Sequence, residues 1–377
     1  MTSAIYPHTL KQRSTSCFLP MKKSLAHSKE LDGLRGCASL SVLVLHLVIT
    51  VTIPLRALGL SNGWRLADQL AGLGSLGVDV FFVLSGFLIT SLLLADRGEP
   101  AYYGNFYWKR ILRIQPVYLL HLIAVWFLLP GSHGYVVLAL VFIVNFDDYF
   151  RVVDVGPAWT LAIEEQFYLV WPQVIGRLSI RNIYRVSIGV LLFSSCLRSG
   201  MLLFLKHAAL RSTWYRLDGL AMGALLACQW MGEREGKTDA IRVFLRVFNS
   251  RLLLVAAVAY EVSFILGFSK SIALIILPTN YLVYRSIGYI MHHPRSKLFG
   301  WLASKPLVFC GAISYSMYMF HTILIYLYDT RITPPSLDPG KFFLRSGVVC
   351  TATLITCIVV RYAIELPAQH LRKYVLR

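Results

Sequence analysis

The run GLGSLGVDVFFVLSGFLITSLLL, residues 72–94, contains a single charged residue, Asp79, and is otherwise almost entirely apolar. A helix needs about 20 mostly apolar residues to cross the hydrocarbon core of a bilayer, so this run is long enough to span a membrane. Further runs at 36–54, 185–205 and 344–364 approach or exceed the same length. The pattern therefore indicates a protein whose helices cross a lipid bilayer.

Composition supports this interpretation. Of the 377 residues, 56% are hydrophobic and 15% are charged, whereas an ordinary soluble domain carries about 25% charged residues. The net charge of +18 would suggest a nucleic-acid partner in a soluble protein, but many of these Lys and Arg residues flank apolar runs, as in the positive-inside pattern. We therefore expect the lipid bilayer and no nucleic acid as a partner. The seven cysteines lack the spacing of a metal site, so no metal is expected.

The positions of the apolar runs and of the basic clusters together predict the topology. The apolar runs lie near 36–54, 72–94, 114–129, 134–147, 158–176, 185–205, 212–230, 251–268, 271–291, 304–328 and 344–364. The basic clusters lie before 36 and at 109–113, 177–185, 234–251, 292–297 and 372–377. Placing every cluster in the cytoplasm requires that 114–129 and 134–147 make one crossing together, with one piece re-entrant or lying along the interface. The expected fold is an all-α integral membrane protein with about ten transmembrane helices and both termini cytoplasmic.

Two regions are expected along the chain. Residues 1–29 are polar and basic and contain no apolar core long enough for a signal peptide, so they are expected to form a disordered cytoplasmic tail. Residues 30–377 contain no repeat and no polar segment long enough for a second fold, which predicts one multi-pass membrane domain.

An ionisable residue inside a membrane span is costly and marks a candidate functional site. Arg35 and His46 are eleven residues apart, a spacing that returns to within about 20° of the same helix face and separates them by roughly 16 Å. Arg35 is thus expected at the cytoplasmic edge and His46 near the midplane. A neutral imidazole there can act as a general base, or it can be a packing residue that hydrogen-bonds a neighbouring helix.

Two further runs contain carboxylates. Asp79 lies well inside its run, six residues before Ser85, and could orient His46 as carboxylates do in catalytic triads. Glu164 and Glu165 are adjacent, in a stretch rich in aromatic residues that includes Tyr168, and such a pair is difficult to explain as packing.

The remaining candidates are basic residues and a second histidine. Arg110 and Arg113 share a helix face on the expected cytoplasmic side, where they could bind phosphates or simply anchor the helix. Arg216 and Asp218 are close enough in sequence to pair near the membrane surface. His321 is equally consistent with a structural hydrogen bond and with a site residue.

The motifs in this order resemble bacterial acyltransferase family three, the membrane O-acyltransferases of the lipopolysaccharide O-antigen and Nod-factor acetylase type. The resemblance extends from Leu31 to about Lys373. It rests on Asp-Gly-Leu-Arg at 32–35 followed by His46, Gly-Val-Asp-Val-Phe-Phe-Val-Leu-Ser-Gly-Phe-Leu at 77–88, Arg110 and Arg113, Trp-Thr-Leu-x-x-Glu-x-x-Phe-Tyr at 159–168, Ile-Ser-Tyr-Ser-x-Tyr at 313–318 before His321, and Glu365-x-Pro367. Thr160 stands where the family usually has Ser.

The resemblance implies an enzyme that transfers an acyl group, usually acetyl from cytoplasmic acetyl-CoA, to a hydroxyl of a carbohydrate such as a cell-envelope polysaccharide or lipopolysaccharide. It also implies a multi-pass protein of the inner (plasma) membrane. The residues on which the family depends correspond to Arg35, His46, Arg110, Arg113 and Glu164. Some relatives carry a fused extracytoplasmic SGNH-type hydrolase domain, so a second step here is expected to need a separate periplasmic or envelope-biosynthesis partner.

The expected mechanism docks the phosphates of CoA on Arg110 and Arg113 and brings the thioester to His46. His46 then deprotonates the acceptor hydroxyl or first accepts the acyl group, while Asp79 and Glu164 orient it. Two alternatives stay open: an acyltransferase with a cytoplasmic secondary metabolite as acceptor, and a proton-coupled transporter, whose pathway would also contain buried carboxylates and histidines.

Overall fold

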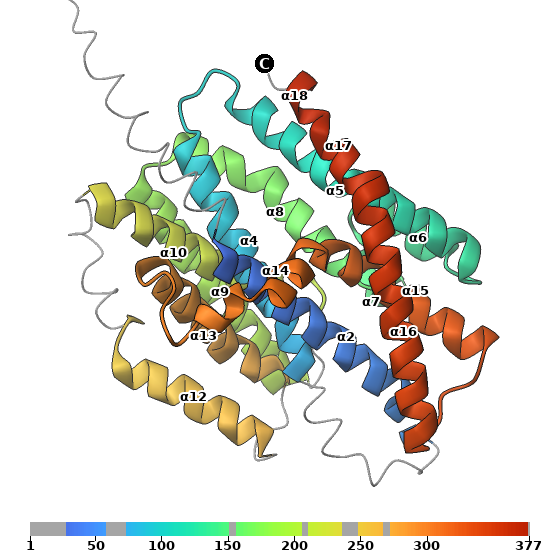
Figure 1. The fold of residues 1–377 in the computed structure, drawn as a ribbon. Coiled ribbons are helices and arrows are strands. Elements are labelled where there is room, and N and C mark those ends of the chain that lie inside the picture. Colours follow the sequence, from blue (N-terminus) through green and yellow to red (C-terminus); the bar gives the residue numbers. More distant parts are fainter. Residues whose placement is uncertain are drawn as a thin grey trace, which may run out of the picture.

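The computed structural model describes residues 28–57, 73–150, 156–205, 210–235, 248–266 and 272–375. These residues form helices and no strand, so the predicted all-helical fold is confirmed (Figure 1). The predicted tail at 1–29 lies outside the described residues except for its last two positions, where α2 begins.

Each apolar run predicted from the sequence overlaps helical structure. The main helices are α2 (Lys29–Ala57), α4 (Leu76–Ala95), α5 (Tyr102–Leu128), α8 (Ala158–Arg177), α9 (Ile180–Leu205), α10 (Leu217–Glu235), α12 (Arg251–Ile265), α13 (Ile272–His292), α14 (Lys305–Ala312), α15 (Ser314–Arg331) and α16 (Pro339–Val360). Shorter helices are α6 (His133–Leu140), α7 (Asp147–Phe150), α17 (Leu366–His370) and α18 (Arg372–Val375), and a π-helical turn at Arg361–Glu365 joins α16 to α17.

Within the described residues, five helical stretches are long and apolar enough to cross a membrane, and a bent helix pair raises this number to six. The five are Lys29–Thr52, Leu73–Ala95, Tyr102–Leu128, Ile180–Leu202 and Pro339–Tyr374. The pair is α14 and α15, which meet at an angle of 72°. The apolar run predicted at 304–328 thus consists of two helices that meet at Ile313, and together they are long and apolar enough to make one bent crossing.

The region between 114 and 147 also differs in detail from the expected pair of runs. Helix α5 continues through Pro116 and is by itself long enough to cross the membrane. Helix α6 has only 8 residues, fewer than the roughly 20 that a crossing needs. This arrangement fits the prediction that the two runs contribute a single crossing.

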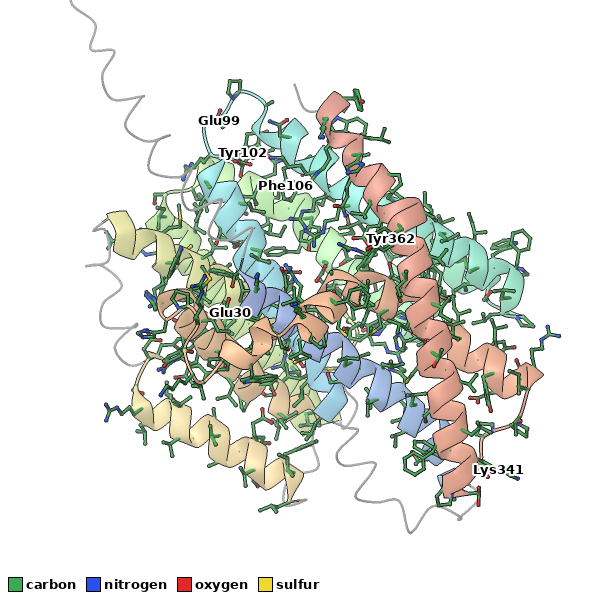
Figure 2. All side chains as sticks on the ribbon, viewed as in Figure 1. Glu30, Glu99, Tyr102, Phe106, Lys341 and Tyr362 are labelled. Atoms are coloured by element: carbon green, nitrogen blue, oxygen red, sulfur yellow. The ribbon has the colours of Figure 1, made fainter. Side chains whose placement is uncertain are left out.

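The outer faces of the helices present large apolar side chains. Phe127 is 79% exposed, Leu252 78% and Phe343 71%, on three different helices. In water such faces would be costly, whereas lipid chains solvate them. Figure 2 shows two charged residues, Glu99 and Lys341, at opposite ends of the bundle, where the helices end.

Glycines permit the close packing at the centre of the bundle, where α4 lies along α10 and α2 lies against α14 (Figure 1). A Cβ atom on Gly86 would overlap the main-chain oxygen of Leu220, and one on Gly223 would overlap that of Val83. On the other contact, a Cβ on Gly311 would overlap the main-chain oxygen of Asp32. Small residues at helix crossings allow such approaches in membranes, and here they hold α2, α4 and α10 in one central group.

Candidate active site

A cavity of about 360 Å³ lies between α2, α4, α5, α8 and α15. Its polar lining consists of Asp32, Arg35, Ser85, Arg110, Arg113, Thr160, Glu164, Tyr168, Ser314, Tyr315 and Tyr318, and its apolar lining of Val78, Phe81, Phe82, Leu88, Ile89, Leu92, Ile114, Leu161 and Met319. Six of the residues singled out in the sequence, from four helices, thus line one space: Arg35, Ser85, Arg110, Arg113, Glu164 and Tyr168.

Three arginines give the cavity a strongly cationic end. Arg35 donates a hydrogen bond to Asp32 Oδ1 at 2.9 Å. The guanidinium of Arg110 lies over the ring of Tyr168, 5.4 Å from its centroid, and Arg113, one turn further along α5, is exposed. Within the described parts of the chain neither Arg110 nor Arg113 forms an ion pair, so both remain available to an anionic ligand.

Glu164 is held in the cavity wall by two hydroxyl groups. Ser85 Oγ on α4 donates to Glu164 Oε1 at 2.7 Å, and Tyr168 OH, one turn along α8, donates to Glu164 Oε2 at 3.0 Å. Both carboxylate oxygens therefore accept a hydrogen bond, and the contact from Ser85 ties α4 to α8. Glu165 does not line the cavity, and its Oε1 is buried without a hydrogen-bond partner among the described residues.

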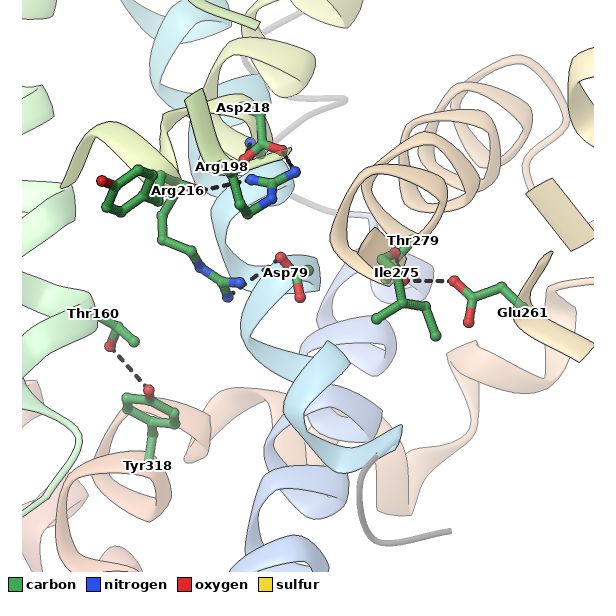
Figure 3. A network of polar contacts seen from close by, with 11 residues as sticks. Asp79, Thr160, Arg198, Arg216, Asp218, Glu261, Ile275, Thr279 and Tyr318 are labelled. Atoms are coloured by element: carbon green, nitrogen blue, oxygen red, sulfur yellow. Dashed lines mark hydrogen bonds and ion pairs between the residues drawn. The ribbon is translucent and has the colours of Figure 1, made fainter. Parts of the chain in front are cut away.

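Tyr318 lies where the cavity approaches the two histidines. Thr160 Oγ1 donates a hydrogen bond of 2.9 Å to its hydroxyl oxygen (Figure 3). The ring of Tyr318 packs edge-on against that of Phe81. The ring of His321 lies one turn further along α15, with its centroid 6.0 Å from that of Tyr318.

His46 and His321 contact each other. His321 Nε2 lies 3.3 Å from His46 Nδ1, and the ring centroids are 4.8 Å apart at an angle of 73°. His321 is 1% exposed, whereas His46 is half-buried. Among the described residues, neither histidine belongs to the cavity lining, so the structure places them behind Tyr318.

Charged residues at the start of α4 and α10 form two buried ion pairs, one of them with Arg198 of α9, and both pairs are drawn in Figure 3. Arg216 Nη2 lies 3.3 Å from Asp79 Oδ1, and Arg198 Nη2 lies 2.7 Å from Asp218 Oδ2. The pairing of Arg216 with Asp218 suggested by the sequence is wrong, because each residue takes its partner from another helix. Asp79 thus has a cationic partner, and its expected role in orienting His46 stays a prediction.

Arg216 also stacks on aromatic rings next to the cavity. Its guanidinium carbon lies 5.4 Å from the ring centroid of Phe82, a lining residue, and 5.7 Å from that of Trp159. The ion pair with Asp79 and these cation–π contacts hold the beginning of α10 against α4 and α8. The sequence analysis did not identify Arg198, although an arginine well inside the run 185–205 is the same kind of signal as Asp79 inside the run 72–94.

Comparison with known proteins identifies the family of the chain. Residues 28–362 match acyltransferase family three, described as an acyltransferase domain, and the chain belongs to this family. It is 29% identical over 328 residues to the O-acetyltransferase OatA of Staphylococcus aureus strain NCTC 8325, a match that covers 78% of this chain and 50% of OatA.

A second relative, from Staphylococcus aureus strain MSSA476 and named as a predicted O-acetyltransferase, is 28% identical over 335 residues, which cover 80% of this chain and 51% of the relative. The chain therefore spans about half the length of the curated relatives it matches. No solved structure matches it. The family predicted from the sequence is confirmed, and with it the class of enzyme, an acyltransferase.

Proposed function

We propose that the chain is a multi-pass O-acyltransferase of the inner (plasma) membrane, which moves an acyl group, in the first place acetyl, from acyl-CoA to a hydroxyl of a carbohydrate acceptor. The observation that carries the proposal is the cavity that brings Arg35, Arg110 and Arg113 together at one end and Glu164 into its wall. Family membership favours this function over a proton-coupled transporter.

The cationic end of the cavity suits the phosphates of acyl-CoA. Planar guanidinium groups bind phosphate oxygens through paired, charge-assisted hydrogen bonds, and Arg110 and Arg113 have no competing ion pair among the described residues. The rest of the cavity lining is apolar, with Val78, Phe81, Phe82 and Leu161 among its residues, and suits the thioester arm and a short acyl chain.

The chemistry needs a base for the acceptor hydroxyl. His46 takes the hydroxyl proton while the hydroxyl oxygen bonds to the thioester carbon, the carbon–sulfur bond breaks, and the departing thiolate receives the proton from the imidazolium. The products are an O-acyl ester and CoA. Tyr318 stands between the cavity and the histidines, so the acyl group has to pass its side chain to reach His46.

The carbohydrate nature of the acceptor rests on the family resemblance. The matched relatives are named O-acetyltransferases, which supports a hydroxyl acceptor and an acetyl group. The second candidate acceptor is a cytoplasmic secondary metabolite. Mass spectrometry of envelope glycans from cells with and without the gene distinguishes the two, and loss of glycan acetylation without the gene would support the carbohydrate acceptor.

Replacing Arg110 and Arg113 tests the donor site. Arg110→Gln/Arg113→Gln is expected to weaken the binding of CoA by about tenfold or more, because a hydrogen bond to a charged group contributes ~1.5–3 kcal/mol. Calorimetric titration of CoA into the purified protein in lipid nanodiscs measures the change. Arg181→Gln, at an exposed arginine at the start of α9, is the matched control and should bind like the native protein. Equal affinity in the double variant would exclude this cavity as the CoA site.

For the topology we propose ten spans with both termini in the cytoplasm. The support is that α5 is long and apolar enough to cross alone while α6 is too short. If α8 is the return crossing, the α8–α9 turn lies on the same side of the membrane as Arg113. A cysteine at position 181 is therefore expected to react with a membrane-impermeant maleimide only in inverted membrane vesicles. Labelling of intact cells from outside would overturn the ten-span arrangement.

A further inference from the structure

We infer that His321 is a positioning residue for His46: its Nε2 accepts a hydrogen bond from His46 Nδ1–H and holds the imidazole as a base. The inference rests on the proposed function, because it assigns a partner to the base of that reaction. The two residues are 275 positions apart in the chain and meet where α15 packs against α2.

The main chain determines which nitrogens carry protons. His46 Nδ1 lies 2.9 Å from the carbonyl oxygen of Val42, and His321 Nδ1 lies 3.0 Å from that of Met317. A carbonyl oxygen accepts hydrogen bonds and cannot donate them, so both Nδ1 atoms carry hydrogen in the neutral histidines. In each ring Nε2 is then the nitrogen with the lone pair.

These tautomers give the contact between the rings a direction. The lone pair of His321 Nε2 faces the Nδ1–H of His46 at 3.3 Å, so that hydrogen is shared between Val42 O and His321 Nε2. The opposite tautomer of His46 would place the lone pair of Nδ1 against two other acceptors. His321 and Val42 O therefore favour the tautomer in which His46 Nε2 is basic.

The same contact stabilises the charge that develops during transfer. When His46 Nε2 takes the hydroxyl proton, the ring becomes an imidazolium, and the Nδ1–H bond to His321 Nε2 becomes charge-assisted. In a Ser-His-Asp triad a buried carboxylate performs this task. Here a neutral histidine that is 1% exposed performs it without adding a second charge to the interior.

The carboxylates proposed for this role from the sequence have other partners. Asp79 lies 3.3 Å from Arg216 Nη2, and Glu164 accepts from Ser85 and Tyr168. The geometry thus favours His321 over both as the residue that orients His46.

Two amide variants of His321 separate positioning from packing. In His321→Gln the side-chain amide reaches the position of Nε2, so its oxygen can accept the hydrogen bond from His46. In His321→Asn the shorter amide reaches only the position of Nδ1, where it can still donate to Met317 O but does not contact His46. A positioning role predicts that His321→Gln keeps most of kcat while His321→Asn loses about 10²-fold. If His321 only packs against its neighbours, His321→Asn should keep as much of kcat as His321→Gln or more.

The assay is the release of CoA thiol from acetyl-CoA, with water as the acyl acceptor, by the protein in lipid nanodiscs. KM for acetyl-CoA should stay near native in both variants, because His321 does not line the cavity. Equal activity or equal loss in the two variants, or a more active His321→Asn, would overturn the role of His321. The proposed function fails separately if the native protein releases no thiol or if His46→Ala is fully active.

Discussion

Replacing His46 with alanine is expected to lower the rate of acyl transfer by about 10²–10⁴-fold, the range that a positioned general base contributes. The substitution removes the nitrogen that takes the proton from the acceptor hydroxyl, while the cavity and its arginines stay in place. The rate is measured as thiol release from acetyl-CoA and as acetylation of envelope glycans in cells. CoA binding should stay near native, which distinguishes lost chemistry from a lost donor site.

The fold should tolerate this substitution. His46 is half-buried, and the hydrogen on its Nδ1 is shared between Val42 O of its own helix and His321 Nε2, so the substitution removes one hydrogen bond between helices and leaves the main chain unchanged. A matched control is His293→Ala, an exposed histidine after α13 that lies outside the cavity lining, and its activity should equal that of the native protein. Native rates in His46→Ala would exclude His46 as the base and would leave Glu164 as the carboxylate to test next.

The positions of the helices could be predicted because hydrophobicity is a local property of the sequence. Each predicted run overlaps helical structure. Four of the residues to which the resemblance pointed, Arg35, Arg110, Arg113 and Glu164, line one cavity, whereas His46 does not. The bend between α14 and α15 could not be predicted from hydrophobicity. It arises where Gly311 packs against the main chain of Asp32, a contact between segments far apart in the chain.

The partners of the buried charged residues could not be predicted for the same reason. Arg216 precedes α10 and Asp218 lies in its first turn, and each forms its ion pair with a residue of another helix, Asp79 on α4 and Arg198 on α9. The contact between His46 and His321 likewise depends on how α15 packs against α2. The expected depth of His46 rests on its spacing from Arg35 and stays a prediction, whereas its neighbour His321 could be identified only from the three-dimensional arrangement.

The ion pair between Arg198 and Asp218 is expected to give the largest effect on stability. The two side chains are 1% and 0% exposed, and Arg198 Nη1 also donates to the carbonyl oxygen of Tyr215 at 2.6 Å. Removing one partner takes the opposite charge away from a buried ion, which costs about 3–5 kcal/mol. Arg198→Met and Asp218→Asn should therefore each lower the unfolding temperature strongly in detergent.

The double variant Arg198→Met/Asp218→Asn should lose much less stability than the sum of the two single variants, because no unpaired charge remains. Thermal unfolding of the four proteins gives the coupling energy directly. Asp96→Asn, which removes the partly exposed bridge to Lys109 at 3.5 Å, is the control and should cost less than about 1 kcal/mol. Additive losses in the double variant would mean that the two charges do not neutralise each other in the membrane, and that the α9–α10 contact depends on packing alone.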